Sequence, residues 1–200
     1  MNRVIVIALV AAIFGGIELG AQASRGAARG VASTLPVVVF DTSKGSFEVE
    51  LYPAEAPKSV EHILTLVRRN FYNGLRVHRF EPGFVVQFGD PQSRDVSKKA
   101  DWGGGGSGRE IGAAEISPKR PHKLGAMALA YVGRLGPATA DSQVYLCVNS
   151  DPGRYSYMNG KYAVIGQVVS GMAVVQQLRE LDVIKRASVK GPAPAPAAKK

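Results

Sequence analysis

The feature that most constrains the fold is the stretch of residues 77–90, where two short apolar segments flank a turn formed by Glu81, Pro82 and Gly83. Each segment has the length and the β-branched and aromatic content of a strand, and the turn residues favour a hairpin. Arg79 lies beside this turn among mostly apolar residues. A guanidinium is always charged and is costly to surround with apolar side chains, so Arg79 invites a functional interpretation.

Similar short apolar segments recur along the chain and are separated by turn residues. We expect eight strands, at residues 36–40, 47–51, 75–80, 84–88, 124–130, 143–148, 163–169 and 182–189. Two segments have helical spacing instead: one begins at Pro57, which suits the first helical position, and the other covers residues 171–181. Because few helices separate the strands, the pattern predicts an antiparallel sheet that is closed or nearly closed.

The 200 residues suit one domain, which we place at residues 35–189. A basic start, an apolar run and a small-residue pattern ending at Ala23 are typical of a secretory signal peptide over residues 1–23. We therefore expect cleavage near Ala23, a flexible lead-in over residues 24–34, and a periplasmic or secreted protein. A retained N-terminal membrane anchor is the alternative, although the run is short for a bilayer span. Residues 190–200, rich in Pro, Ala and Lys, predict a disordered tail.

The net charge of +9 favours anionic surfaces. Lys and Arg are scattered, however, and no basic stripe with interleaved aromatic residues is present, so we expect no nucleic-acid partner. Cys147 is the only cysteine, which excludes an internal disulfide, and its apolar neighbours predict a buried, unreactive thiol. The three histidines lack the spacing of a zinc motif, so we expect no metal site.

The long irregular segment over residues 91–122 carries two ambiguous features. A glycine-rich stretch matches the G-x-G-x-x-G pattern of nucleotide-binding loops at Gly103, Gly105 and Gly108. No apolar strand precedes it and no clear helix follows, so a flexible surface loop is the preferred interpretation. Glu110 and Glu115 lie in the same segment, and only the fold decides whether they pair as acid and base.

Strand alternation makes a specific prediction about Arg79. It places Arg79 on the same face as Leu75 and Val77, which is apolar. Phe84 and Gln87 are three residues apart, so a bulge would be needed to aim both at one site. Periodicity alone therefore predicts an unusual arginine near a glutamine and no particular reaction.

Four segments in order resemble the cyclophilins, a family of peptidyl-prolyl cis–trans isomerases, in a bacterial exported form. Residues 78–90 match the family pattern H-R-x…F-x-x-Q-x-G-D, residues 124–128 match G-x-x-[SA]-M-A, residues 141–147 resemble G-S-Q-F-F-I, and residues 158–168 resemble L-D-G-K-[HY]-x-x-F-G-x-V. The resemblance covers residues 36–186. It implies a mainly β fold, a closed eight-stranded antiparallel β-barrel capped by two α-helices.

The resemblance also implies roles for individual residues. Arg79 would be the catalytic residue, and the substrate-binding residues would be Phe84, Gln87, Met127, Ala128, Leu129, Ala130, Gln143, Tyr145, Met158 and Tyr162. The proline pocket would be lined by Phe84, Met127, Tyr145 and Met158, with Tyr162 beside them. Gln87 and Gln143 would orient Arg79 and the substrate backbone, and residues 128–130 would form a groove wall.

The implied activity assists protein folding by stabilising the twisted X–Pro amide. We expect that it needs no cofactor and that its clients are proline-containing polypeptides. We also expect the protein to be a monomer without stable membrane insertion after signal cleavage. Three residues depart from the family pattern: Tyr157 stands in place of tryptophan, Leu129 in place of asparagine and Phe88 in place of glycine. These departures leave open a rival interpretation, a proline-binding chaperone or scaffold with little turnover.

Overall fold

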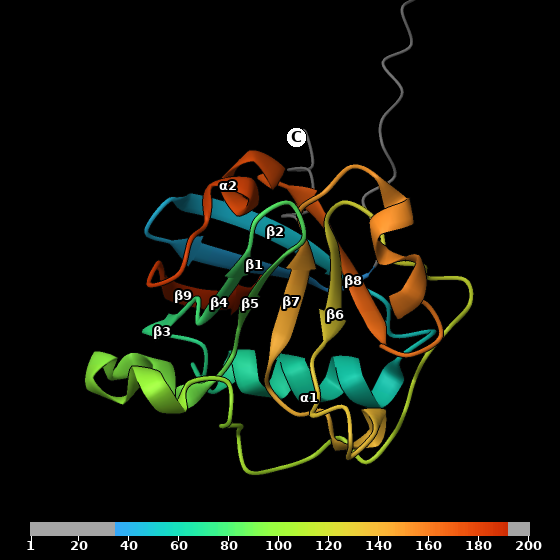
Figure 1. Cartoon of the computed structure of the whole chain (residues 1–200), viewed down its shortest axis with the longest axis horizontal. Helices are drawn as coiled ribbons and strands as arrows, with labels where there is room; N and C mark the ends of the chain where they lie inside the picture. Colours follow the sequence, from blue (N-terminus) through green and yellow to red (C-terminus); the bar gives the residue numbers. More distant parts are fainter. Residues whose placement is uncertain (1–34, 192–200) are drawn as a thin grey trace, which may run out of the picture. The chain divides into compact units, whose positions relative to one another are not determined.

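A nine-stranded antiparallel sheet is the main element of residues 35–191, the part of the chain that this computed structural model describes (Figure 1). The strand order is β3-β9-β1-β2-β8-β6-β7-β5-β4. The strands are β1 Val37–Thr42, β2 Gly45–Leu51, β3 Leu75–Arg76, β4 Arg79–Glu81, β5 Val85–Phe88, β6 Ala126–Leu129, β7 Val144–Cys147, β8 Val164–Ser170 and β9 Val183–Val189. The predicted signal peptide, the predicted lead-in and residues 192–200 of the predicted tail lie outside the described residues.

The prediction of a closed eight-stranded barrel is wrong in two respects. The expected strand at residues 75–80 is interrupted at Val77 and His78, so it forms two short strands, β3 and β4. The backbone N–H of Val77 donates to Asp182 O at 2.8 Å, whereas that of His78 donates to Gln87 O at 3.1 Å. The chain therefore crosses here from the β9 side to the β5 side. β3 and β4 become the two edges of a curled sheet and are not paired with each other.

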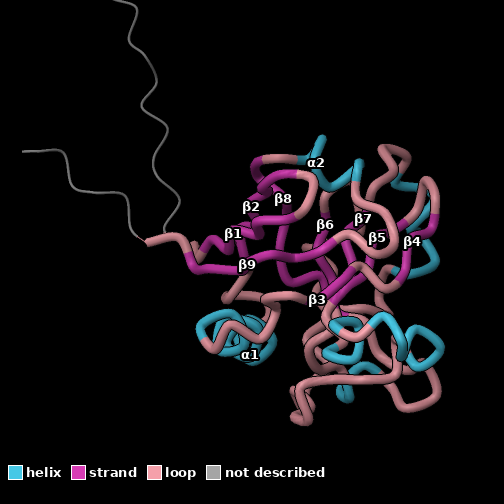
Figure 2. The backbone as a smooth tube through the Cα atoms, turned by 90° about the vertical axis from the view of Figure 1, so that its left-hand side faces the viewer, coloured by secondary structure: helices cyan, strands magenta, loops and turns pink. Residues whose placement is uncertain are grey.

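The long helix α1, Pro57–Arg68, forms where the sequence predicts it. Its apolar face packs into the main core. The helix lies beside the sheet (Figure 2). No N-cap side chain closes its first turn. The carboxylate of Glu115 does so instead, accepting hydrogen bonds from the backbone N–H groups of Lys58 at 3.0 Å and Ser59 at 2.8 Å.

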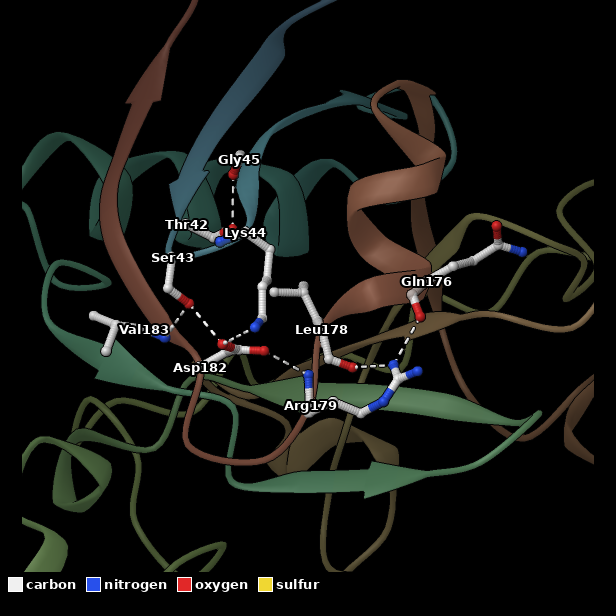
Figure 3. Close-up of polar contacts among 9 residues, drawn as sticks. All are labelled: Thr42, Ser43, Lys44, Gly45, Gln176, Leu178, Arg179, Asp182 and Val183. Atoms are coloured by element: carbon white, nitrogen blue, oxygen red, sulfur yellow. Dashed lines mark hydrogen bonds and ion pairs between the residues drawn. The ribbon is translucent and has the colours of Figure 1, made fainter.

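The second helix, α2, covers only Met172–Gln177, whereas residues 171–181 were predicted to be helical. Leu178 is already extended. The carboxylate of Asp182 accepts hydrogen bonds from Arg179 N at 2.8 Å and from Ser43 Oγ at 2.7 Å, and pairs with Lys44 Nζ at 3.7 Å (Figure 3). These contacts hold the segment after α2 against the β1–β2 turn, which explains the early end of the helix.

Four short 3₁₀ helices lie between the strands: η1 Pro91–Arg94, η2 Val96–Asp101, η3 Pro137–Thr139 and η4 Pro152–Met158. Within residues 35–191, no helix is long and apolar enough to cross a lipid bilayer.

Alternation along β5, β6, β7 and β8 divides the buried apolar residues into two clusters. The main core lies on one face of the sheet and also contains the buried residues of α1. From these strands it includes Val86, Met127, Leu146 and Ile165. A smaller cluster takes the opposite face and is formed by Tyr52, Val85, Ala126, Ala128, Tyr145, Cys147, Tyr155, Met158 and Val164. We call it the outer cluster. It forms the apolar base of the candidate site.

Candidate active site

A row of cross-strand neighbours crosses the sheet on the face that carries the outer cluster. The strand register pairs Arg79 with Gln87, Gln87 with Tyr145, Tyr145 with Ala128, and Ala128 with Val164. Directly opposite residues of antiparallel strands point to the same face. The row therefore places one cation, one amide and three apolar or aromatic side chains side by side, from five different strands.

The polar end of the row is a chain of hydrogen bonds. Arg79 Nη1 donates to Gln87 Oε1 at 3.2 Å, and Gln87 Nε2 donates to Gln143 Oε1 at 2.9 Å. Gln143 Nε2 in turn donates to the backbone carbonyls of Gly103 at 2.8 Å and Gly105 at 2.7 Å. Because each amide uses both of its ends, their orientations are fixed, and the guanidinium of Arg79 is held from one side.

Arg79 differs from the sequence prediction in its environment. Its side chain is 46% exposed and makes an ion pair with Glu81 at 3.4 Å, whereas Leu75 and Val77 are fully buried. The interruption at residues 77 and 78 explains the difference, since alternation does not continue across it. One guanidinium N–H is committed to Gln87, and five are present in total, so donors remain for a substrate.

The bulge that strand alternation would require to aim Phe84 and Gln87 at one site is absent. The register of β4 and β5 is regular, and Phe84 precedes β5 in the turn after β4. Its ring stacks on Tyr155, with centroids 5.5 Å apart, and on Tyr157, with centroids 6.2 Å apart. The hydroxyl of Tyr155 donates to Phe84 O at 2.7 Å. These contacts position Phe84 beside the outer cluster without any irregularity of the strand.

The structure brings most of the expected pocket residues together. Ala128, Tyr145 and Met158 belong to the outer cluster, and Phe84, Ala130 and Tyr162 pack against it. Met127 and Leu129 do not join them: both are buried in the main core on the opposite face of β6. The expectation that Met127 lines the pocket is therefore wrong, because neighbouring residues of one strand point to opposite faces.

His122 supports the site and was missed by the sequence analysis, since nothing in its irregular segment marks it. The backbone N–H and the ring Nδ1 of His122 both lie 2.9 Å from Asn159 Oδ1. An amide oxygen only accepts, so Nδ1 carries the proton and Nε2 accepts the Tyr145 hydroxyl at 2.8 Å. Burial lowers the pKa of His122 and keeps it neutral, although the bond to Asn159 opposes this shift. The neutral ring therefore accepts the Tyr145 hydroxyl and fixes the position of that side chain.

The glycine-rich stretch forms a loop that is held by Asp141. This carboxylate accepts hydrogen bonds from Ser107 Oγ at 2.5 Å, Gly108 N at 3.1 Å and Arg109 N at 3.3 Å. It also contacts His62 Nε2 on α1 at 2.9 Å. Burial raises the pKa of Asp141, but the bonds from His62 and Ser107 outweigh burial and leave the pKa below its usual value. A charged Asp141 therefore anchors the loop whose carbonyls bind Gln143.

A cavity of about 450 Å³ lies between this loop and the sheet. Its lining includes Gln87, Gln143, Ala130 and several loop glycines. The loop glycines are committed to protein partners: Gly103 N and Gly105 N donate to Asp90 Oδ2 at 2.5 and 3.1 Å. These amides cannot also cradle a phosphate, which argues against nucleotide binding by the glycine-rich loop.

The structure also decides the environment of Cys147 and the open question of Glu110 and Glu115. Cys147 is buried, as predicted, and burial raises the pKa of its thiol to about 12. Glu115 caps α1, so it does not pair with Glu110 as acid and base. Among residues 35–191, no group of three or more His, Cys, Asp or Glu side chains is arranged to hold a metal ion.

The family is decided by comparison with known proteins. The model of the cyclophilin type peptidyl-prolyl cis-trans isomerase family matches residues 37–194, which include every residue of the row. The chain belongs to this family. The cyclophilin is 35% identical over 188 residues to a probable peptidyl-prolyl cis-trans isomerase of Brucella suis, covering 92% of this chain and 90% of that protein.

A second relative supports the same assignment, and a solved structure shares the fold. The cyclophilin is 39% identical over 141 residues to peptidyl-prolyl cis-trans isomerase-like 1 of Aspergillus niger, covering 70% of this chain and 80% of that protein. It shares the fold of a Cryptosporidium parvum cyclophilin, with a TM-score of 0.67, 24% identity, and coverage of 80% of this chain and 99% of that one. The protein is a cyclophilin-type peptidyl-prolyl cis–trans isomerase, with a mainly β cyclophilin fold.

The structure gives a physical context to two departures of this cyclophilin from the family pattern. Phe88 is fully buried and makes edge contacts with Phe40 and Tyr72, with ring centroids 5.4 and 6.1 Å apart. It therefore fills the main core away from the row. Tyr157 is 59% exposed and extends the aromatic stack of Phe84 toward solvent.

Proposed function

We propose that this cyclophilin accelerates rotation about X–Pro bonds of protein clients by binding the twisted amide, with Arg79 as its catalytic residue. The observation that carries the proposal is the row in which Arg79, held by Gln87, stands beside the outer cluster. It combines a fixed donor with an apolar surface suited to a pyrrolidine ring.

The chemistry requires no bond cleavage. Amide resonance sets a rotation barrier of about 18–20 kcal/mol. When the amide twists, resonance is lost and the prolyl nitrogen regains its lone pair. A guanidinium N–H donates to that lone pair only in the twisted state, so the contact lowers the barrier without stabilising the planar substrate.

The apolar residues supply the other half of the mechanism. Phe84, Met158 and Tyr162, with Tyr145, provide a surface on which the proline ring rests while the rest of the peptide rotates. Burying the ring there lowers the local dielectric and strengthens the contact with Arg79. Gln143, fixed by the loop carbonyls, adds an amide that orients the substrate backbone.

Proline-containing polypeptides are the proposed clients. In support, a Cryptosporidium parvum cyclophilin of similar fold was crystallised in the presence of the dipeptide Ala-Pro. We further propose that the protein acts outside the cytoplasm as a monomer after cleavage near Ala23, which rests on the sequence pattern of residues 1–23. N-terminal sequencing of exported protein tests the cleavage, and an intact Met1 in that fraction would refute it.

An isomerisation assay on a proline tetrapeptide tests the catalytic proposal against the scaffold alternative. We expect wild-type protein at micromolar concentration to accelerate cis–trans exchange well beyond its uncatalysed time of about 10–100 s. Binding of the same peptide is measured in parallel by isothermal titration calorimetry. Saturable binding without acceleration would favour a proline-binding scaffold and refute the proposal.

A further inference from the structure

A second cavity, of about 370 Å³, lies at the C-terminal end of α1 and is separate from the row described above. Its polar lining comes from His62, Arg69, Arg94, Ser107 and Arg109 with their neighbours, and its apolar lining includes Phe71. None of its nine lining residues is an aspartate or a glutamate. We call it the basic pocket.

The guanidinium of Arg94 is held in place before any ligand arrives. It donates to the backbone carbonyls of Phe71 and Asn73, the latter at 3.2 Å, and its carbon lies 5.7 Å from the centre of the Phe71 ring. A guanidinium positioned in this way loses little conformational entropy when it binds a ligand.

Arg69 and Arg109 have no carboxylate partner within salt-bridge distance among residues 35–191, and both are exposed. The helix dipole accounts for an arginine at the end of α1, such as Arg69. It does not account for Arg94 and Arg109, which come from two other segments. The carboxylate of Asp141 contacts two lining residues, His62 and Ser107, and is already engaged by them.

We propose that the basic pocket binds an oxyanion carried by the client polypeptide, either a carboxylate or a phosphate on a serine or threonine. Guanidinium groups that line one cavity and have no acidic partners match the planar, multi-oxygen geometry of these groups. A bound oxyanion would also relieve the mutual repulsion of the three arginines. The basic pocket would then favour clients with an acidic or phosphorylated residue near the proline.

Arg109 connects the basic pocket with the catalytic site. It lines both the basic pocket and the 450 Å³ cavity that contains Gln87 and Gln143. We therefore extend the proposal to a single client segment that reaches from the row past Arg109 to the basic pocket. This part of the inference rests on the proposed function, whereas anion binding by the pocket does not.

The first test is a titration of full-length protein with inorganic phosphate at low ionic strength, followed by amide NMR and matched by a chloride titration. We expect saturable shifts at residues 69–71 and 107–109. The variant Arg69→Gln should weaken phosphate binding by about tenfold or more, since a charge-assisted hydrogen bond is lost. The control Arg186→Gln, on β9 and in none of the described cavities, removes the same charge and should stay within about twofold. No saturable shift, or equal weakening by both variants, would overturn the proposal.

The second test distinguishes a client anion from a free one. Proline peptides carry a single aspartate or phosphoserine at successive positions on either side of the proline, and kcat/KM is compared with that of the serine peptide. We expect at least one position to raise kcat/KM about tenfold in wild type and in Arg186→Gln but not in Arg69→Gln. Phosphate binding without such a position would overturn the client assignment. Failure of the serine peptide itself to isomerise would instead count against the proposed function.

Discussion

Replacement of Arg79 by alanine tests the catalytic proposal most directly, because its expected effects on activity and on stability differ widely. The side chain is about half exposed, and its ion pair with Glu81 at 3.4 Å lies at the surface. Such pairs contribute about 0–1 kcal/mol, so the free energy of unfolding should fall by no more than about that amount. A hydrogen bond from a charged donor in the transition state is worth about 1.5–3 kcal/mol. Its loss corresponds to a fall in kcat/KM of about 10- to 150-fold.

The assay is isomerisation of a proline tetrapeptide together with urea unfolding of the same preparations. Arg79→Lys keeps the charge but loses the fork that reaches Gln87, so most of the decrease should remain. Glu81→Gln is the matched control, because it removes the ion pair and leaves Arg79 and Gln87 in place; it should keep kcat/KM within about twofold. If Arg79→Ala lost as much stability as activity, or kept wild-type turnover, the reasoning about this residue would be refuted.

Three further perturbations test the supporting structure. Burial lowers the pKa of His122, so the unfolded state binds more protons than the folded state below pH about 6.5. In urea titrations, the free energy of unfolding should therefore fall as the pH is lowered below this value. The fall should be less steep in His122→Asn. Tyr145→Phe leaves the buried His122 Nε2 without a partner and should cost about 1–3 kcal/mol in the same measurement. Asp141→Ala removes the anchor of the glycine-rich loop, so hydrogen exchange of Gly108 N–H should accelerate. The value of kcat/KM should fall because the loop carbonyl that orients Gln143 is no longer fixed. The wild-type stabilisation by Asp141 should be present above pH about 4 and be lost in more acidic solution.

Local periodicity predicted α1 and most of the strands, whereas α2 was predicted too long because contacts with Asp182 set its end. Pro57 predicted the start of α1, and helical spacing predicted the face that it buries, which includes Val60, Ile63, Leu64 and Val67. The prediction of one strand over residues 75–80 was wrong because no proline, glycine or other turn residue in this segment marks the break. Only the competing backbone partners of Val77 and His78, which are distant in sequence, interrupt it.

Predictions for the site likewise succeeded where residue type and order were sufficient and failed where strand face or distant contacts decided. The types of residue and their order along the chain were sufficient to identify the family and to nominate Arg79, Gln87 and Gln143, which the fold joins by hydrogen bonds. Met127 was misplaced because a motif does not say which face of a strand a side chain occupies. His122 could not be found, since its partners Tyr145 and Asn159 are 23 and 37 residues away.

The sequence by itself determined the start of α1, most of the strands, the family, and therefore the reaction, because these depend on local periodicity and on residue types in a fixed order. Tertiary structure alone decided which side chains meet: a row drawn from five strands, a loop anchored by Asp141, and a basic pocket built from three separate segments. The physical reason is that strand register and loop docking are settled by contacts between residues far apart in the chain, which no local pattern encodes.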